Sequence, residues 1–387
     1  MNATPPSAND RVLRLLSYLA IDPLSRSIRI DLAHAAFDAN QHDVCDRALD
    51  ELQQESPHSS ELLNLAGLNA LARGNPEQAI EALRAIPASE RNAVVQYNIA
   101  YALALLEKYE EALVHLTDRV LAALPEAVAL RIRTLHHLNR LDEAVSLGAQ
   151  HADTQPELAA PLAVALFDMG NSAAARRYAQ RAGDSPDAWT ILALLDLERG
   201  ATDSAEQNLT KALQKDPTHV RATLGMGLVR MAQQRFEAAA QLLDAAAQSF
   251  RNHAGSWLAS GWAYLYHGDL ITSRKRFEQA EAIDRSFAEV HGSLAVLDCR
   301  EGLLAAARRR ADTALRLDPA SLSAALANSL LQSSANDHEQ AQRTIEVALQ
   351  MPIGSDGPAL MTALSLYLTS RQEKTPRKAA SLSDPSH

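Results

Sequence analysis

The side chains of this chain that are suited to metal or redox chemistry are thirteen histidines and two cysteines. No H-E-x-x-H pattern and no paired C-x-x-C occurs, and these are the spacings that place metal ligands side by side. His136 and His137 are adjacent, so on a helix their side chains point about 100° apart and do not share a metal easily. Cys45 and Cys299 lie far apart and are expected as core or near-core thiols rather than a disulfide, which is typical of a reducing compartment. The sequence therefore predicts neither a bound metal nor a cofactor.

Two glycine-containing segments match catalytic loops only in part. Gly225-Met-Gly227 lacks the third glycine of a phosphate-binding loop and lies in a helical segment with no strand before it. Gly255-Ser256-Trp257 is not a G-x-S-x-G elbow, and no strand precedes it either. Aspartates and glutamates are spread along the predicted outer faces of helices and form no acid–base pair. These observations predict that the chain is not an enzyme.

Small residues recur at an almost constant interval and indicate how the chain is organised. One series steps by 30 to 34 residues through Cys45, Ala79, Ala112, Ala144, Ala175, Ala205, Ala239, Ser273, Ala307 and Ala341. A second series runs twelve residues ahead of it through Ala33, Gly67, Ala100, Ile132, Ala163, Ala193, Gly227, Gly261, Ala295 and Ser329. A fixed period of this length is typical of an array of stacked helical repeats rather than of a globular enzyme core.

Each period is predicted to form two antiparallel helices joined by a short turn. In one period the first helix runs from about Glu61 to Arg73, with apolar residues at helical spacing. Gly74 suits a left-handed position after that helix, and Pro76 suits the first turn of the next. The second helix ends at Pro87. Small residues in both series allow the two helices to approach closely, and neighbouring pairs must stack to bury their apolar faces.

This pattern resembles the tetratricopeptide repeat family. One close match to the family motif consists of Trp189, Leu192, Ala193, Ala205, Leu209, Ala212 and Pro217. A second consists of Trp257, Gly261, Tyr264, Gly268, Phe277 and Ala280. The resemblance covers most of the chain in about ten degenerate repeats. It implies an all-α fold, an α-solenoid in which antiparallel helix pairs wind into a right-handed superhelix.

The period also divides the chain into segments. Residues 1–24 are expected as an N-terminal segment and a capping helix that begins at Asp10, and residues 25–353 as the repeat array. A Gly, Ser and Pro break precedes a C-terminal capping helix at 354–371, and 372–387 is expected as a disordered tail. The spacing shortens near 125–187, so we predict a local change of superhelical twist there.

In arrays of this family the first helices of the pairs line a concave groove, which indicates where a partner would lie. The side chains predicted to bind a partner there are Asn64, Tyr97, Asn98, Tyr101, Arg133, His136, His137, Trp262 and Tyr266. Asn64 and Asn98 stand one 34-residue period apart, and an amide side chain both donates to and accepts from a peptide backbone. Aromatic side chains bury a large area with few rotatable bonds. The alternative is that these side chains pack on one another within a tightly wound array.

Charge and hydropathy narrow the class of partner. The net charge of −10 argues against a broad nucleic-acid or anionic-membrane surface, and no stretch is apolar enough to span a bilayer. We therefore expect a cytoplasmic interaction scaffold, such as an adaptor, chaperone or assembly factor, that binds a protein or peptide. A homodimer through a terminal repeat is allowed for. The alternative function is a sensor whose superhelix changes pitch when a peptide or small ligand binds.

Overall fold

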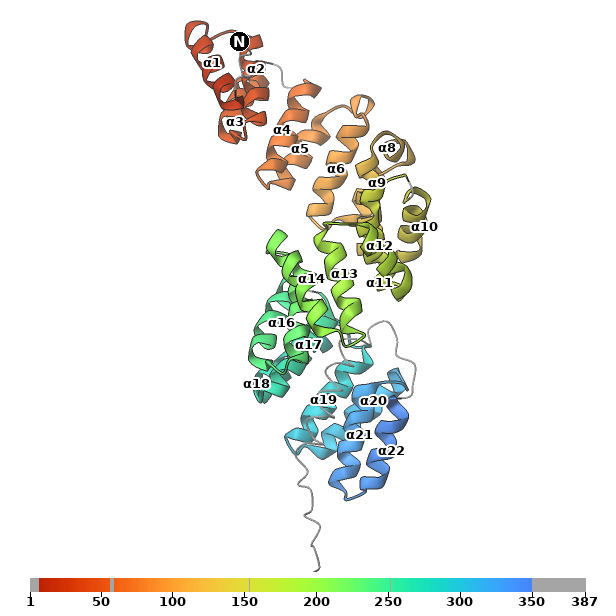
Figure 1. Ribbon diagram of the computed structural model, residues 1–387. Helices are drawn as coiled ribbons and strands as arrows, with labels where there is room; N and C mark the ends of the chain where they lie inside the picture. Colours follow the sequence, from red (N-terminus) through yellow and green to blue (C-terminus); the bar gives the residue numbers. More distant parts are fainter. Residues whose placement is uncertain (1–6, 56–58, 153, 251, 350–387) are drawn as a thin grey trace, which may run out of the picture. The chain divides into compact units, whose positions relative to one another are not determined.

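The computed structural model describes residues 7–55, 59–152, 154–250 and 252–349. Across these ranges the chain forms α-helices and two short 3₁₀ helices, with no strand (Figure 1). None of the helices within these ranges combines the length and the apolar character that crossing a membrane requires. The chain divides into two units, Met1–Ala165 and Leu166–His387. The predicted C-terminal capping helix and tail lie outside the described residues.

The first unit contains the red to olive helices of Figure 1. They are α1 (Ala8–Ile21), α2 (Arg26–Asp38), α3 (His42–Glu55), α4 (Ser60–Ala72), α5 (Pro76–Ala85), η1 (Ala88–Glu90), α6 (Ala93–Leu105), α7 (Tyr109–His115), α8 (Asp118–Ala123), α9 (Pro125–His137), α10 (Leu141–His151) and η2 (Pro156–Leu158). Helix α11 (Ala159–Asp168) contains the boundary between the units. That boundary falls within the segment whose period is shortened.

The second unit continues with helices of ten to fifteen residues. They are α12 (Ser172–Arg181), α13 (Pro186–Leu197), α14 (Thr202–Lys215), α15 (Val220–Ala232), α16 (Phe236–Phe250), α17 (Ala254–His267), α18 (Leu270–Ile283), α19 (Ala288–Arg300), α20 (Leu304–Leu317), α21 (Leu322–Ser334) and α22 (His338–Leu349). From α2 to α22 the described helices form ten consecutive pairs, and α8 is an addition between the third and fourth. The all-α solenoid is confirmed.

The turns follow the predicted chemistry in one pair and differ at the N-terminus. Gly74 has φ +76° after α4, and Pro76 begins α5, as expected. The expectation that Asp10 caps the first helix is wrong. Ser7 is the N-cap, and Asp10 is the third helical residue whose carboxylate returns a hydrogen bond to the backbone N–H of Ser7. The two residues form a reciprocal capping box, in which an acidic residue one turn into the helix completes the cap.

Close packing explains why small residues recur. Apart from Ser329, which is half-buried, every residue of the two series is buried. A Cβ atom added at Gly67 would lie 2.5 Å from Cγ of Leu83, and one at Gly261 would lie 2.4 Å from the ring of Phe277. These contacts join the first helix of a pair to the second, so a larger side chain would force the helices apart.

Buried carboxylates connect successive pairs in the second unit. Asp244 on α16 accepts hydrogen bonds from the Arg276 guanidinium on α18 at 2.6 and 2.8 Å, and another from the Ser260 hydroxyl on α17. Asp298 on α19 forms ion pairs with Arg274 at 2.6 Å and with Arg310 at 3.4 Å. Each buried charge is therefore compensated by a cation from another helix, as its desolvation requires.

Helices α19 and α21 pack on each other more closely than the sequence period predicts. A Cβ atom added at Gly292 would lie 2.5 Å from the backbone nitrogen of Ala324 and 2.6 Å from Cβ of Ser323. The Glu289 carboxylate accepts hydrogen bonds from the N–H groups of Leu322 and Ser323 at the start of α21. Burial raises the pKa of Glu289, although these hydrogen bonds oppose the shift. The first helices of two neighbouring pairs thus meet directly at this point.

Gly292→Ala is expected to destabilise the chain by about 1–3 kcal/mol, because the new methyl group meets backbone that cannot rotate away. The expected result is a lower thermal midpoint, measured by circular dichroism. Gly255→Ala is the matched control, since its Cβ would meet only the His253 ring at 3.2 Å. An unchanged midpoint for Gly292→Ala would show that the close contact does not constrain the fold.

The two cysteines are free, as predicted, and should differ in reactivity. Cys45 is buried, and burial, assisted by the negative charge of Asp46, raises the pKa of its thiol to about 12. Cys299 is partly exposed, and its thiol contacts the carbonyl oxygen of Ala327 at 3.8 Å. Because the thiolate is the reactive form, Cys45 should resist a thiol reagent at neutral pH until the protein is denatured. Titration of Cys45→Ser and Cys299→Ser variants assigns each reaction, and rapid modification of Cys45 in the native protein would contradict the expectation.

Candidate functional site

Helices α4, α6 and α9 present the accessible part of the predicted binding set. Each helix has thirteen residues, so their positions can be compared by counting from the first residue. The ninth residues are Leu68, Tyr101 and Arg133. Tyr101 is 41% exposed, Arg133 is exposed and Leu68 is half-buried. The ninth position of these helices therefore faces away from the core.

The two predicted asparagines do not occupy equivalent positions, so that part of the prediction is wrong. Helices α4 and α6 begin 33 residues apart, whereas Asn64 and Asn98 are 34 residues apart. Asn64 is the fifth residue of its helix and is half-buried. Asn98 is the sixth residue of α6 and is only 7% exposed, because that position faces the core. The residue of α6 equivalent to Asn64 is Tyr97.

Both asparagines nevertheless retain unused hydrogen-bonding capacity. Among the described residues, Oδ1 of Asn64 and Nδ2 of Asn98 are buried atoms without a hydrogen-bond partner. A buried amide atom without a partner is costly, since it has given up its hydrogen bonds to water. One acceptor and one donor are thus unsatisfied on α4 and α6.

Tyr97 and Tyr101 form the centre of the accessible surface. Their rings stack with centroids 6.3 Å apart and an interplanar angle of 16°. Burial raises the pKa of Tyr97, the negative charge of Glu126 raises it further, and the positive charge of Arg133 opposes the rise. Because these charges act on Tyr97, α9 places Arg133 and Glu126 beside the tyrosine pair. The structure therefore brings Tyr97, Tyr101 and Arg133 together.

Apolar side chains extend this centre along α6. Val94, Tyr101 and Leu105 are all exposed, and Tyr97 packs against the buried core with part of its surface open. Their spacing places them along one face of the helix. The name α6–α9 surface is used below for this face of α6 together with Glu126 and Arg133 of α9.

The predicted histidine pair lies at the last turn of α9 and forms ring contacts. His136 and His137 meet edge to face, with centroids 5.6 Å apart. His137 also stacks on Tyr109 of α7, with centroids 4.5 Å apart and rings within 2° of parallel. In the part of the chain that the structure describes, no cluster of histidine, cysteine and acidic residues is arranged to hold a metal.

Trp262 and Tyr266 on α17 do not belong to an open surface. Trp262 is only 1% exposed, and its Nε1 donates to the Ser293 hydroxyl on α19 at 3.0 Å. The Ser293 hydroxyl in turn donates to that of Ser323 on α21 at 3.2 Å. Tyr266 stacks on Phe236 with centroids 5.0 Å apart. The expectation that Trp262 lines an accessible groove is wrong, because neighbouring helices cover this part of α17.

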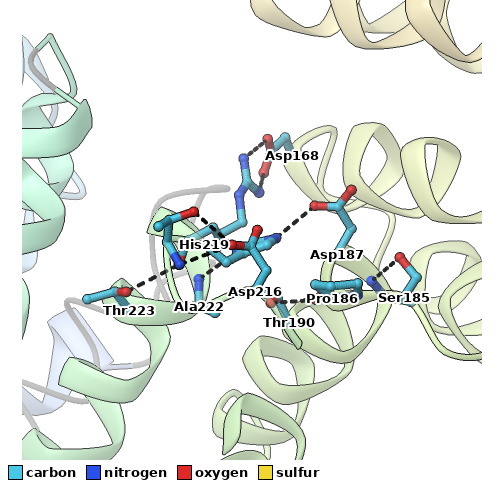
Figure 2. A network of polar contacts seen from close by, with 12 residues as sticks. Asp168, Ser185, Pro186, Asp187, Thr190, Asp216, His219, Ala222 and Thr223 are labelled. Atoms are coloured by element: carbon cyan, nitrogen blue, oxygen red, sulfur yellow. Dashed lines mark hydrogen bonds and ion pairs between the residues drawn. The ribbon is translucent and has the colours of Figure 1, made fainter. Parts of the chain in front are cut away.

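A polar network that the sequence analysis did not identify joins α11, α13 and α15 (Figure 2). The Arg221 guanidinium on α15 donates two hydrogen bonds of 2.7 Å to the Asp168 carboxylate on α11. These residues are 53 positions apart, so the contact passes over the intervening pair that begins with α13. Burial opposes ionisation of Arg221, but the hydrogen bonds and charge of Asp168 outweigh it and raise the pKa.

His219 connects the same helices through both ring nitrogens. Its Nδ1 accepts from the backbone N–H of Ala222 at 3.1 Å and so caps α15. The ring proton is therefore on Nε2, which lies 2.9 Å from the Asp187 carboxylate on α13 (Figure 2). A sequence signal was present, because polar side chains cap α13, α15, α17 and α21 at a 34-residue spacing or twice that spacing: Ser185, His219, His253 and Ser321.

The ten described helix pairs define the class of this protein as an α-solenoid of helical hairpins. Residues 30–93 and residues 196–260 each match a tetratricopeptide repeat model. The chain belongs to the tetratricopeptide repeat family.

Solved structures with the same fold span most of the chain. A human IFIT1 dimer with PPP-AAAA is similar over 90% of this chain and 95% of its own, with 16% identity and a TM-score of 0.51. The APC/C hetero-tetramer Cut9-Hcn1 is similar over 94% of this chain and 87% of its own, with 11% identity and a TM-score of 0.51. At these identities the likeness is one of fold. The curated proteins contain no match.

Asp168→Asn and Arg221→Gln are each expected to lower stability, because either change leaves a partly buried group with its partner impaired. A double-mutant cycle should give a coupling free energy on the order of 1 kcal/mol, as for a two-pronged, partly exposed pair. The measurement is urea denaturation followed by circular dichroism.

Arg221→Lys is the control for that cycle, since it keeps the charge but loses the two-pronged geometry. It should fall between the wild type and Arg221→Gln. Additive effects of Asp168→Asn and Arg221→Gln would show that the contact is energetically neutral.

Proposed function

We propose that this chain is a non-enzymatic scaffold that binds a segment of a partner protein at the α6–α9 surface. Tetratricopeptide repeats in two parts of the chain support a role in protein interaction. The finer role, as an adaptor, chaperone or assembly factor, depends on the partner. The proposal concerns the first unit alone.

The exposed aromatic stripe on α6 is the observation that carries the proposal. Large apolar side chains lie side by side on the helix and remain open to solvent at Val94, Tyr101 and Leu105. Clustered exposed apolar groups favour an interaction site, whereas single ones are ordinary on protein surfaces. Stacking restricts the rotation of Tyr97 and Tyr101, so they lose little conformational freedom when a partner covers them.

Polar groups next to the stripe favour a polypeptide as the occupant. A peptide offers a donor and an acceptor at each residue, which are the groups that Oδ1 of Asn64 and Nδ2 of Asn98 require. Both atoms are buried, so a small movement of the side chains on binding would have to expose them. Arg133 and Glu126 add charges of opposite sign. A partner with an apolar anchor and a mixed-charge flank fits this surface.

The same features weigh against a nucleic acid. Binding to phosphates depends on several cations acting together, whereas here Arg133 is accompanied by Glu126 and the net charge of the chain is −10. The likeness to IFIT1 with PPP-AAAA concerns the fold. An RNA oligonucleotide with a 5′ triphosphate is therefore a competing probe in the experiment below.

Tyr101→Ala is expected to weaken partner binding at least tenfold, because an anchor at the centre of an interface contributes more than its rim. The thermal midpoint should fall little, since this side chain is 41% exposed. The partner is identified by placing a photo-crosslinking aromatic residue at position 101 and sequencing the attached segment. That segment is then synthesised and titrated against the wild type, Tyr101→Ala and Arg133→Ala by calorimetry.

Val114→Ala is the matched control, because Val114 is an exposed apolar residue of α7 in the same unit. It should leave binding unchanged. Equal affinity of the wild type and Tyr101→Ala for the peptide would refute the proposed site. Saturable binding of the RNA at this surface, or of a small ligand in place of any peptide, would replace the scaffold with a nucleic-acid-binding protein or with the sensor alternative.

A further inference from the structure

Helix α1 has two apolar faces, of which the chain itself covers one. Val12 is fully buried, and Leu15 and Leu19 pack against the same core as α2 and α3. On the other side of the helix, Leu13 is 65% exposed and Ile21 is 83% exposed. The exposed side is called the α1 outer face, and its members are Leu13, Leu16, Ser17, Ala20 and Ile21.

This face is larger than the occasional apolar residue of a soluble surface. Its members follow one another at three- and four-residue spacing, so they form a continuous stripe along the helix. Leu24, in the turn that follows α1, is exposed and extends the apolar surface beyond Ile21. Several large side chains in so short a segment indicate an interface, since water is a poor solvent for such a patch.

We propose that the α1 outer face binds the same face of a second copy of this chain, with the two α1 helices antiparallel. The order of residue sizes supports this arrangement. A two-fold axis between Leu16 and Ser17 places Leu16 opposite Ser17 of the other copy, and Leu13 opposite Ala20. Each large side chain then meets a small one, in both halves of the interface, so the face is complementary to itself.

The charges favour the same antiparallel arrangement. The axis that matches large to small residues also places Arg11 of one copy opposite Asp22 of the other, once in each half. Arg11 and Arg14 then lie near the C-terminal end of the partner helix, where the helix dipole is negative. A parallel pair would instead place Arg11 beside Arg11 and Leu13 beside Leu13. Opposite charges and complementary sizes therefore coincide in one register.

The first experiment measures mass by light scattering after size-exclusion chromatography of the full chain at several concentrations. The wild type should form a dimer that dissociates on dilution. Leu13→Glu and Leu16→Glu should each raise the dissociation constant at least tenfold, because the two-fold axis counts each charge twice. Ile271→Glu is the control, since Ile271 is an exposed apolar residue of α18 in the other unit, and it should leave the dimer unchanged.

The second experiment tests the register by exchanging charges. Arg11→Asp and Asp22→Arg should each weaken the dimer severalfold, because each places like charges opposite one another. The double variant restores opposite charges in both halves and should recover most of the wild-type affinity. An interface formed by any other arrangement of α1 would not show this recovery.

Three results would overturn the proposal. A wild type that stays monomeric at every concentration would exclude the dimer, and a dimer that tolerates Leu13→Glu would place the interface elsewhere. A monomer that binds phosphatidylcholine–phosphatidylserine vesicles, and loses that binding in Leu13→Glu, would show that the face meets a lipid surface. Recovery of neither single variant by the charge exchange would refute the register.

Discussion

The close approach of paired helices is the constraint on which the rest of this structure depends. Small residues at two positions per period let side chains such as Leu83 and Phe277 pack directly over the backbone of the facing helix, at Gly67 and Gly261. A single pair buries too little apolar surface to be stable, so pairs must stack, and each stacking contact adds to the same core. Closely packed helix pairs therefore account for the alanine content, the absence of strands in the described residues and the repeated turns.

Stacking alone does not decide what each surface presents, and the two units show this at one position. The ninth residue of the first helix is exposed at Tyr101 and Arg133, whereas its equivalent Trp262 is buried. The difference arises because α19 and α21 approach each other at Gly292, and a chain of hydroxyl groups connects Trp262 to both of these helices. An accessible aromatic surface therefore requires neighbouring first helices that stay apart, as on α6. The ion pair from Asp168 to Arg221 belongs to the closely wound case, since it spans an entire pair.

Polar groups in this fold serve two different ends. Asp244 and Asp298 are buried beside arginines from other helices, which compensates their charge and defines which helices are neighbours. His219 combines a helix cap with a contact to the preceding pair, so one side chain fixes both the start of α15 and its neighbour. Asn64 and Asn98 differ from these residues, because each retains an unsatisfied atom next to the tyrosine pair. Satisfied networks maintain the array, and unsatisfied groups are better placed to recognise something outside it.

The sequence by itself determined the helices, their pairing and the buried residues, because these depend on local spacing: a period near 34 places small residues at every close contact. It also singled out Tyr97, Tyr101 and Arg133, which lie together in the structure. It misplaced Asn98 because a period of 34 was applied to helices that begin 33 residues apart, and one residue turns a side chain by about 100° on a helix. Only the tertiary structure decided that Trp262 is buried, that Asp168 meets Arg221 and that α1 leaves a second apolar face open. These features depend on how successive pairs are rotated against one another, which is set by contacts between distant residues and not by the period.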